Sequence, residues 1–133
     1  MPFQPPDLMG QAIQFRKVMS QPIATDNTRV QTMQLSLIVE ESAEFLAASG
    51  LKQETSLDFN LIEPDINQLK ELVDLVYVCF QYAAAMGWPL DEALDRVHAS
   101  NMSKLVDGKP LRREDGKVLK GPNYKPPYLD DLV

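Results

Sequence analysis

The amino-acid sequence predicts an all-α fold, a bundle of four or five helices whose core is completed by association of several copies. Three observations support this class. The apolar residues of the long segments recur at helical spacing, caps and helix-ending residues divide the chain, and no run of useful length alternates apolar with polar residues as a strand would. Four broad apolar faces in 133 residues are more than one small core covers, so we expect a homodimer or a homotetramer.

The first expected helix begins at Asp7 and ends near Ser20. An aspartate at such a place caps a helix because its carboxylate accepts a hydrogen bond from a free backbone N–H of the first turn. Pro22 follows, and proline cannot continue a helix because it lacks the N–H donor and its ring clashes with the preceding turn.

The second expected helix covers residues 27–49. Asp26 or Thr28 can cap its N-terminus, and Gly50 can close its C-terminus in the left-handed conformation that glycine adopts without steric cost. Residues 50–63 are polar and show no periodicity, so we expect them to form a loop.

The third expected helix runs from about Glu63 to Met86. Pro64 fits its first turn, where the missing N–H would have no partner in any case, and Gly87 is placed to end it.

The fourth expected helix covers residues 90–105, with Asp91 and Glu92 favourable at its positive end. Beyond it, dipeptides that contain glycine or proline interrupt every regular pattern. We therefore expect one helical domain over residues 1–105 and an irregular tail over residues 106–133.

Charge is distributed unevenly between these two parts. Residues 1–105 carry 7 lysines and arginines against 14 aspartates and glutamates, a net charge of −7, whereas residues 106–133 carry 6 against 5, a net charge of +1. The overall charge of −6 argues against a surface that binds nucleic acid. An acidic body with a mildly basic tail suits an anionic ligand that arrives with metal ions, and the tail is either a lid over that ligand or a solvated extension.

The single cysteine, Cys79, excludes a disulfide within one chain, so a reducing, cytoplasmic location is expected. The N-terminus has neither the basic nor the apolar region of a secretion signal. No uncharged apolar stretch approaches the roughly 20 residues that cross a bilayer, so we expect no membrane partner.

Five acidic residues lie inside the two most hydrophobic segments of the chain. A carboxylate removed from water without a partner is strongly unfavourable, or else it takes up a proton. A divalent cation is the most economical compensation for several of them together. The five are Glu40, Glu41, Glu44, Glu71 and Asp74.

The spacing of these acids predicts that they meet. Glu41 and Glu44 are three residues apart, as are Glu71 and Asp74, so each pair shares a helix face. Two antiparallel helices would bring the pairs together, and their mutual repulsion would require a counter-ion. Oxygen ligands favour Mg²⁺ or Mn²⁺ over Zn²⁺, and several carboxylates around more than one ion suit phosphoryl chemistry. The competing interpretation is an ordinary solvated acidic face.

The sequence also resembles a known family. Residues 40–44 (EESAE) and 71–74 (ELVD) are similar to the EExxE…ExxD pattern of the all-α nucleoside triphosphate pyrophosphohydrolase superfamily, which includes MazG-like proteins, dimeric dUTPases and phosphoribosyl-ATP pyrophosphohydrolases. Residues 98–105 (HASNMSKL) resemble its Asn-x-x-Lys element on the last helix. Residues 115–127 (DGKVLKGPNYKPP) resemble the tail of a phosphoribosyl-ATP-pyrophosphohydrolase-like subgroup, so the resemblance covers roughly residues 8–127.

The resemblance implies an enzyme that cleaves a nucleoside triphosphate between its α and β phosphates, giving the monophosphate and pyrophosphate. It assigns the binding of Mg²⁺, with Mn²⁺ as a substitute, to Glu41, Glu44, Glu71 and Asp74. It makes Glu40 either a further ligand or the base that orients and deprotonates the attacking water.

The resemblance places substrate contacts in the C-terminal part of the chain. Lys104 would contact a phosphate, and Asn101 would bind a phosphate oxygen or orient a metal ligand from the same helix face. Lys120 belongs to a basic run that would close over the triphosphate, and Tyr124 would stack on the base. Asn101 and Lys104 also fit an exposed polar helix face. Lys120 also fits a solvated tail, and Tyr124 also fits packing within the tail.

Three functions are compatible with the sequence. The preferred one is a Mg²⁺-dependent nucleotide pyrophosphohydrolase that acts on (d)NTPs. The second is phosphoribosyl-ATP hydrolysis in histidine biosynthesis, within the same fold. The third is a non-catalytic helical oligomerisation or nucleotide-binding module whose acids bind metal only for stability.

Overall fold

The computed structural model describes residues 3–50 and 63–133. In these ranges lie four α-helices, one two-stranded hairpin and one short 3-10 helix, so the predicted all-α class is confirmed. The chain forms two compact units, Met1–Trp88 and Pro89–Val133. None of the helices in the described ranges is long and apolar enough to cross a membrane.

Helix α1 (Leu8–Val18) begins as predicted at Asp7. The Asp7 carboxylate accepts a hydrogen bond of 2.9 Å from the N–H of Gly10. A side chain at position 10 would meet that carboxylate, so the Asp7 side chain would have to shift to make room for it. The helix ends at Val18, slightly before the expected end near Ser20.

Helix α2 (Thr28–Ala48) has the predicted extent but a different cap. Asn27, rather than Asp26 or Thr28, caps it: its side-chain oxygen accepts from the N–H groups of Arg29 and Val30 at 3.0 and 3.4 Å. Three consecutive residues here are good caps, and the choice depends on which of them has the extended backbone. Gly50 follows the helix with a φ of 97°, as expected, whereas the predicted loop lies almost wholly outside the described residues.

Helix α3 (Ile66–Met86) begins later than predicted. Asp65 caps it by accepting a hydrogen bond of 2.8 Å from the N–H of Gln68, so Pro64 precedes the cap and the prediction that it lies in the first turn is wrong. Gly87 ends the helix as predicted, in the left-handed conformation with a φ of 78°.

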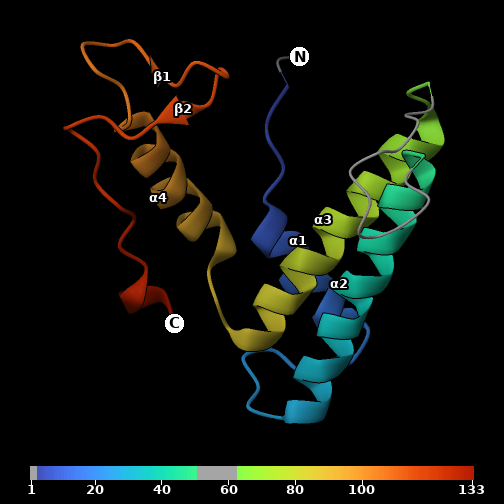
Figure 1. The fold of residues 1–133 in the computed structure, drawn as a ribbon. Helices are drawn as coiled ribbons and strands as arrows, with labels where there is room; N and C mark the ends of the chain where they lie inside the picture. The colour runs from blue at the N-terminus through green and yellow to red at the C-terminus, as the bar shows by residue number, and fades with distance from the viewer. Residues whose placement is uncertain (1–2, 51–62) are drawn as a thin grey trace. The chain divides into compact units, whose positions relative to one another are not determined.

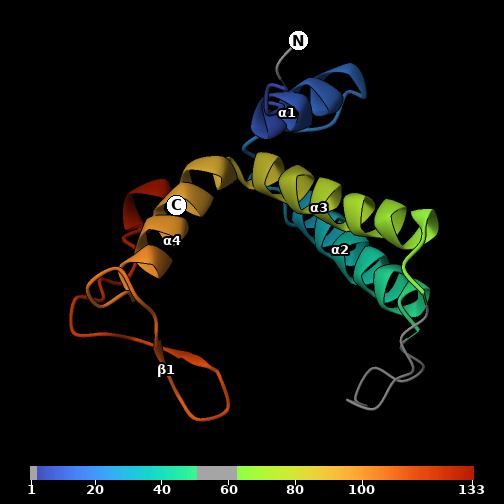
Figure 2. The same ribbon diagram turned by 90° about the horizontal axis from the view of Figure 1, so that it is seen from above.

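Helices α2 and α3 lie side by side and run antiparallel, as predicted for the two acidic helices (Figure 1). Helix α1 packs against α3 near the C-terminal end of α3 (Figure 2). The core of this first unit is small, because four of its six buried apolar residues are alanines. Its buried apolar residues are Met9, Ala12, Phe80, Ala83, Ala84 and Ala85.

Arg16 of α1 is a buried charge, with only 1% of its surface exposed. Its Nε donates to the carbonyl of Pro22 at 2.7 Å, and its Nη1 donates to the side-chain oxygen of Gln81 at 3.4 Å. Burial lowers the pKa of this guanidinium, which stays charged because an arginine pKa is far above neutrality. The connection between α1 and α2 is thus fixed to the C-terminal end of α3. Two backbone hydrogen bonds add to this anchor, from Ala24 N–H to the carbonyl of Ala84 and from Thr25 N–H to that of Ala85.

The second unit begins with helix α4 (Leu90–Met102), which has Asp91 and Glu92 in its first turn as predicted. The helix ends at Met102, so the expected extension to residue 105 is wrong. Ser103 instead bonds to the tail, because its hydroxyl accepts a hydrogen bond of 2.9 Å from the N–H of Lys125.

The tail contains a short antiparallel hairpin of β1 (Leu111–Arg112) and β2 (Val118–Leu119) and the 3-10 helix η1 (Asp130–Leu132). A strand of two residues is too short to show the alternation of apolar and polar residues that indicates a strand, so the hairpin was not predicted. The compact units divide the chain between residues 88 and 89 and group α4 with the tail. The division into a domain of residues 1–105 and a tail of residues 106–133 stays a prediction.

Candidate metal centre

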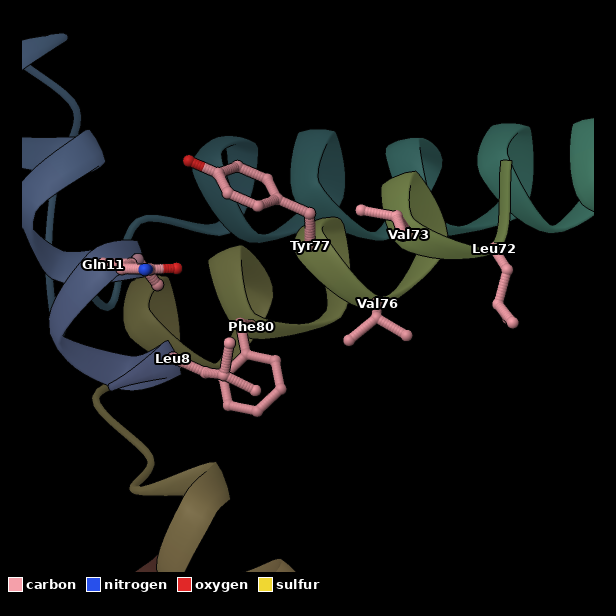
Figure 3. A pocket seen from close by; sticks show the side chains of 8 residues that line it. Leu8, Gln11, Leu72, Val73, Val76, Tyr77 and Phe80 are labelled. Carbon is pink, nitrogen blue, oxygen red and sulfur yellow. The ribbon is translucent and has the colours of Figure 1, made fainter. Parts of the chain in front are cut away.

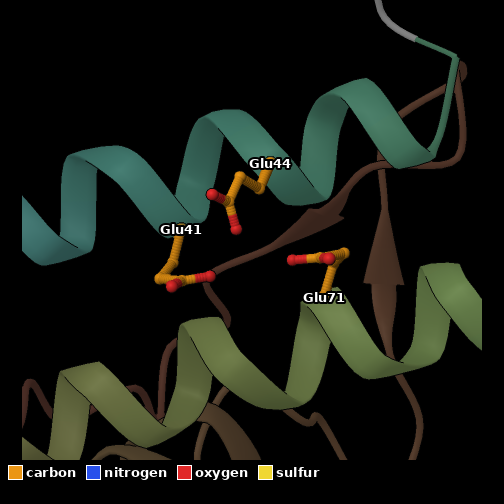
Figure 4. Close-up of side chains that lie close together, drawn as sticks. All are labelled: Glu41, Glu44 and Glu71. Carbon is orange, nitrogen blue, oxygen red and sulfur yellow. The ribbon is translucent and has the colours of Figure 1, made fainter.

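Three carboxylates converge between α2 and α3. Glu41 and Glu44 project from α2 toward Glu71 of α3 (Figure 4). One carboxylate oxygen of each lies within 4.8 Å of an oxygen of both others. The three-residue spacing on α2 puts two acids on one face, and the antiparallel neighbour supplies the third. We call Glu41, Glu44, Glu71 and the adjacent Asp74 the acidic cluster.

Two oxygens of the acidic cluster are buried without a partner. Oε2 of Glu41 and Oε2 of Glu71 accept no hydrogen bond from any described residue, and the Glu71 side chain is only 15% exposed. A buried carboxylate oxygen without a donor is unfavourable. A cation bound by oxygen would supply the missing partner, and a donor set of carboxylates is the kind that Mg²⁺ and Mn²⁺ prefer. The residues therefore fit a divalent ion of this class.

The pKa of Glu41 is raised above its ordinary value. Burial is the largest cause; the hydrogen bond with Glu44 and the negative charges of Glu44, Asp74 and Glu71 add to it. Burial and like charge both disfavour the ionised form. Without a cation, Glu41 therefore holds its proton more tightly than an isolated glutamate does.

Asp74 lies one turn after Glu71 and faces a lysine that was not among the predicted site residues. Lys70 Nζ lies 2.6 Å from Oδ2 of Asp74 and 3.8 Å from Oε1 of Glu71. The hydrogen bond to Asp74, and then the charges of Asp74 and Glu71, raise the pKa of Lys70. Its position immediately before Glu71, four residues from Asp74, was the sequence signal for this contact.

Glu40 is exposed on α2 and is not one of the three carboxylates that converge. Adjacent residues of an α-helix point about 100° apart, so Glu41 facing α3 turns Glu40 away from it. Its assignment as a base or a further ligand stays a prediction.

The predicted substrate-binding residues lie in the second unit. Asn101 is exposed in the last turn of α4, but Lys104 lies beyond the end of the helix, so the expected helix face shared by the two is wrong. A turn keeps them close, since Lys104 N–H donates to the carbonyl of Asn101 at 3.2 Å. Lys120 and Tyr124 contact each other, with Lys120 Nζ 4.7 Å from the centre of the tyrosine ring. Their roles toward a substrate stay predictions.

An apolar groove of about 380 Å³ lies between α1 and α3 and was not predicted. Tyr77 forms part of its wall and packs edge-on against Phe15 of α1, with 5.6 Å between ring centres. The spacing of apolar residues along one helix does not indicate which other helix packs against its apolar face. The sequence therefore carried no signal for this groove. Figure 3 shows the side chains that line the groove, with labels on Leu8, Gln11, Leu72, Val73, Val76, Tyr77 and Phe80.

Comparison with known proteins identifies one family. The family model described as phosphoribosyl-ATP pyrophosphohydrolase matches residues 12–101. The match includes the whole acidic cluster, Glu40 and Asn101, and it ends before Lys104. A comparison with curated proteins returned no significant match.

Proposed function

Since the chain belongs to the phosphoribosyl-ATP pyrophosphohydrolase family, within the MazG-like superfamily, we propose that it hydrolyses the bond between the α and β phosphates of a nucleoside triphosphate in a Mg²⁺-dependent reaction. Membership makes the chain a nucleotide pyrophosphohydrolase, a hydrolase of phosphoric anhydride bonds, which decides against a non-catalytic module. The products are the nucleoside monophosphate and pyrophosphate.

The observation that supports Mg²⁺ most directly is the convergence of Glu41, Glu44 and Glu71 with two unpartnered buried oxygens. We assign the binding of Mg²⁺, or Mn²⁺ in its place, to these three residues and Asp74. When bound, such an ion neutralises charge on the phosphates and acidifies a coordinated water. The protein's own contribution is to hold four carboxylates on two packed helices, so that little reorganisation accompanies the reaction.

Five further assignments complete the proposal. Glu40 orients and deprotonates the attacking water or adds a ligand, Lys104 and Lys120 bind phosphate oxygens, Asn101 binds phosphate or orients a ligand, and Tyr124 stacks on the base. The contact of Lys120 with Tyr124 supports a joint role for this pair, because one segment then presents a cation and an aromatic face together.

Phosphoribosyl-ATP is the second candidate substrate, and the description of the matching family model favours it. It carries the same triphosphate, so the acidic cluster would serve both substrates alike. The two candidates differ in what must be recognised beyond the phosphates.

We further propose that the active protein is a homodimer or homotetramer. Apolar side chains on α2 and α3 are exposed to an unusual degree, with Val39 70%, Leu69 60% and Val73 53% exposed. A folded chain seldom leaves so much apolar surface on its two longest helices uncovered, and a second copy is the simplest cover. Sedimentation of the purified protein would test this, and a monomer at all concentrations would contradict it.

A substrate panel tests the proposed reaction. Purified protein is incubated with Mg²⁺ and each of the common NTPs and dNTPs, with phosphoribosyl-ATP included, and both products are identified. Release of pyrophosphate with the matching monophosphate, abolished by EDTA, is the expected result. Release of orthophosphate, or no turnover of any substrate with either Mg²⁺ or Mn²⁺, would contradict the proposal.

A further inference from the structure

Lys70 is the only cation within ion-pair distance of the acidic cluster among the described residues. Its ammonium group contacts Asp74 at 2.6 Å and Glu71 at 3.8 Å, and its side chain is 63% exposed, so it approaches these two acids of α3 from the solvent side. It makes no ion pair with Glu41 or Glu44, the two acids of α2.

The stability of α3 alone does not explain this contact. In an isolated helix, an acid placed four residues before a lysine stabilises more than the reverse order, and here the lysine comes first. Lys70 is the fifth residue of α3 and lies beyond its first turn, so the helix dipole gives no support to a positive charge there either. What favours an ammonium group at this point is the group of carboxylates beside it.

We propose that Lys70 is a displaceable counter-ion, which holds Asp74 in the metal-free protein and leaves it when a divalent ion binds. This inference rests on the proposed metal centre and assigns its regulation to a residue outside the set of ligands. Lys70 contacts an oxygen of Asp74, which we assign as a ligand of the ion, and its positive charge repels the incoming ion. Because the pair is exposed, the contact is weak enough to exchange.

Displacement has a measurable consequence. An ion that must replace Lys70 binds more weakly than it would without the lysine, whereas the metal-free protein is more stable with the lysine present. Removal of the charge at position 70 therefore tightens metal binding and destabilises the metal-free fold at the same time. If Lys70 merely supported the helix, its removal would lower the stability of the metal-free fold and leave the affinity for metal unchanged.

The test measures Mn²⁺ binding by calorimetry for the wild-type protein, Lys70→Gln and Lys70→Arg. Glutamine retains helix propensity without the charge, and arginine retains the charge. We expect Lys70→Gln to bind Mn²⁺ more tightly by up to about fivefold, the upper end of the range for loss of one exposed ion pair, and Lys70→Arg to bind like the wild type. Lys17→Gln is the matched control, since Lys17 is an exposed lysine of the same unit on α1 and its loss changes the net charge equally.

Melting in EDTA supplies the second measurement, in which Lys70→Gln should unfold at a lower temperature than the wild type and gain more from added Mn²⁺. An Mn²⁺ affinity of Lys70→Gln that is equal to or weaker than that of the wild type would overturn the inference while leaving the metal centre intact. A tightening of the same size in Lys17→Gln would overturn it as well, because net charge would then be the cause. If the wild-type protein binds no Mn²⁺ at all, the metal centre itself is wrong, and the inference fails with it.

Discussion

In the unit formed by α4 and the tail, Asp131 accepts two hydrogen bonds from Arg96, and Asp115 accepts two from Arg113. These arginines lower the pKa of both carboxyl groups. Between α2 and α3, in contrast, the pKa of Glu41 is raised and two buried oxygens have no partner in the described chain. Within the described ranges, arginines of the second unit thus pair with these two carboxylates of its tail, whereas the acidic cluster has only one exposed lysine. The difference supports our proposal that an ion completes the acidic cluster.

The largest effect that tests this contrast is on catalysis. Glu41→Gln removes a proposed ligand with little change in shape, and we expect pyrophosphate release to fall more than about 100-fold, since loss of even an outer partner of a metal site costs 10–100-fold. Initial rates at saturating Mg²⁺ provide the measurement. Glu63→Gln, an exposed glutamate ahead of α3, is the control and should retain wild-type activity. A Glu41→Gln rate within about twofold of the wild type would remove Glu41 from the metal centre.

The second effect is on stability in the presence of metal. Mg²⁺ or Mn²⁺ at about 100 times its dissociation constant should stabilise the fold by about 2.7 kcal/mol, because the ion binds only the folded chain. Thermal unfolding in EDTA and in increasing Mg²⁺ measures this. Asp131→Asn should show the same gain, since its carboxylate is already paired with Arg96. A melting curve that responds neither to EDTA nor to the two ions would show that the acidic cluster binds no metal.

The pH dependence of stability sharpens the contrast, because Glu41 and the two aspartates of the tail change the stability of the fold in opposite directions as the pH rises. The folded state of metal-free protein binds more protons at Glu41 than the unfolded state does, so stability falls as the pH rises above the ordinary carboxyl value of 4.5 and through the raised pKa. The lowered pKa values of Asp115 and Asp131 give stability that is present above 3.8 and lost as the pH falls below it.

Urea unfolding in EDTA at about pH 5 and about pH 7 measures this difference. We expect the wild type to be more stable at the lower pH and Glu41→Gln to depend less on pH, because the substituted side chain no longer titrates. An equally steep fall in Glu41→Gln would assign the effect to other groups.

The smallest effect is expected for the paired acids of the tail. Asp131→Asn removes an exposed ion pair with Arg96, and such pairs contribute little, so the melting temperature should fall by no more than about 2 °C. Asp130→Asn, at the neighbouring exposed position, is the control. A loss comparable to the effect of metal removal would show that the tail supports the whole fold.

The features that could be predicted from the sequence are those fixed by local spacing. Asp7 as a cap, Gly87 as a helix end and the approach of Glu41 to Glu71 follow from one or two helical turns and the antiparallel pairing of two long helices. The cap at Asn27 was missed because its two neighbours are equally suitable by residue type.

Contacts between distant segments could not be predicted. The contact that follows the end of α4 is one of them, since Lys125 binds Ser103 from 22 residues further along the chain. The groove between α1 and α3 depends in the same way on which helix faces meet. Lys70 is a different case. Its four-residue spacing from Asp74 is visible in the sequence, but many lysines on solvated helices have the same spacing from an acid, so it does not single out Lys70.

Hydrogen bonds hold the pair of long helices together at both of its ends. Hydrogen bonds from Arg16 and from residues 24 and 25 fix the connection that leads into α2 to the C-terminal end of α3, whereas Glu44 and Glu71 lie toward the opposite ends of their helices. At that opposite end, Gln68 of α3 donates a hydrogen bond of 2.8 Å to the hydroxyl of Ser49, which follows α2. The acids therefore lie between two ties, and the packing of the two helices sets the separation that an incoming ion meets.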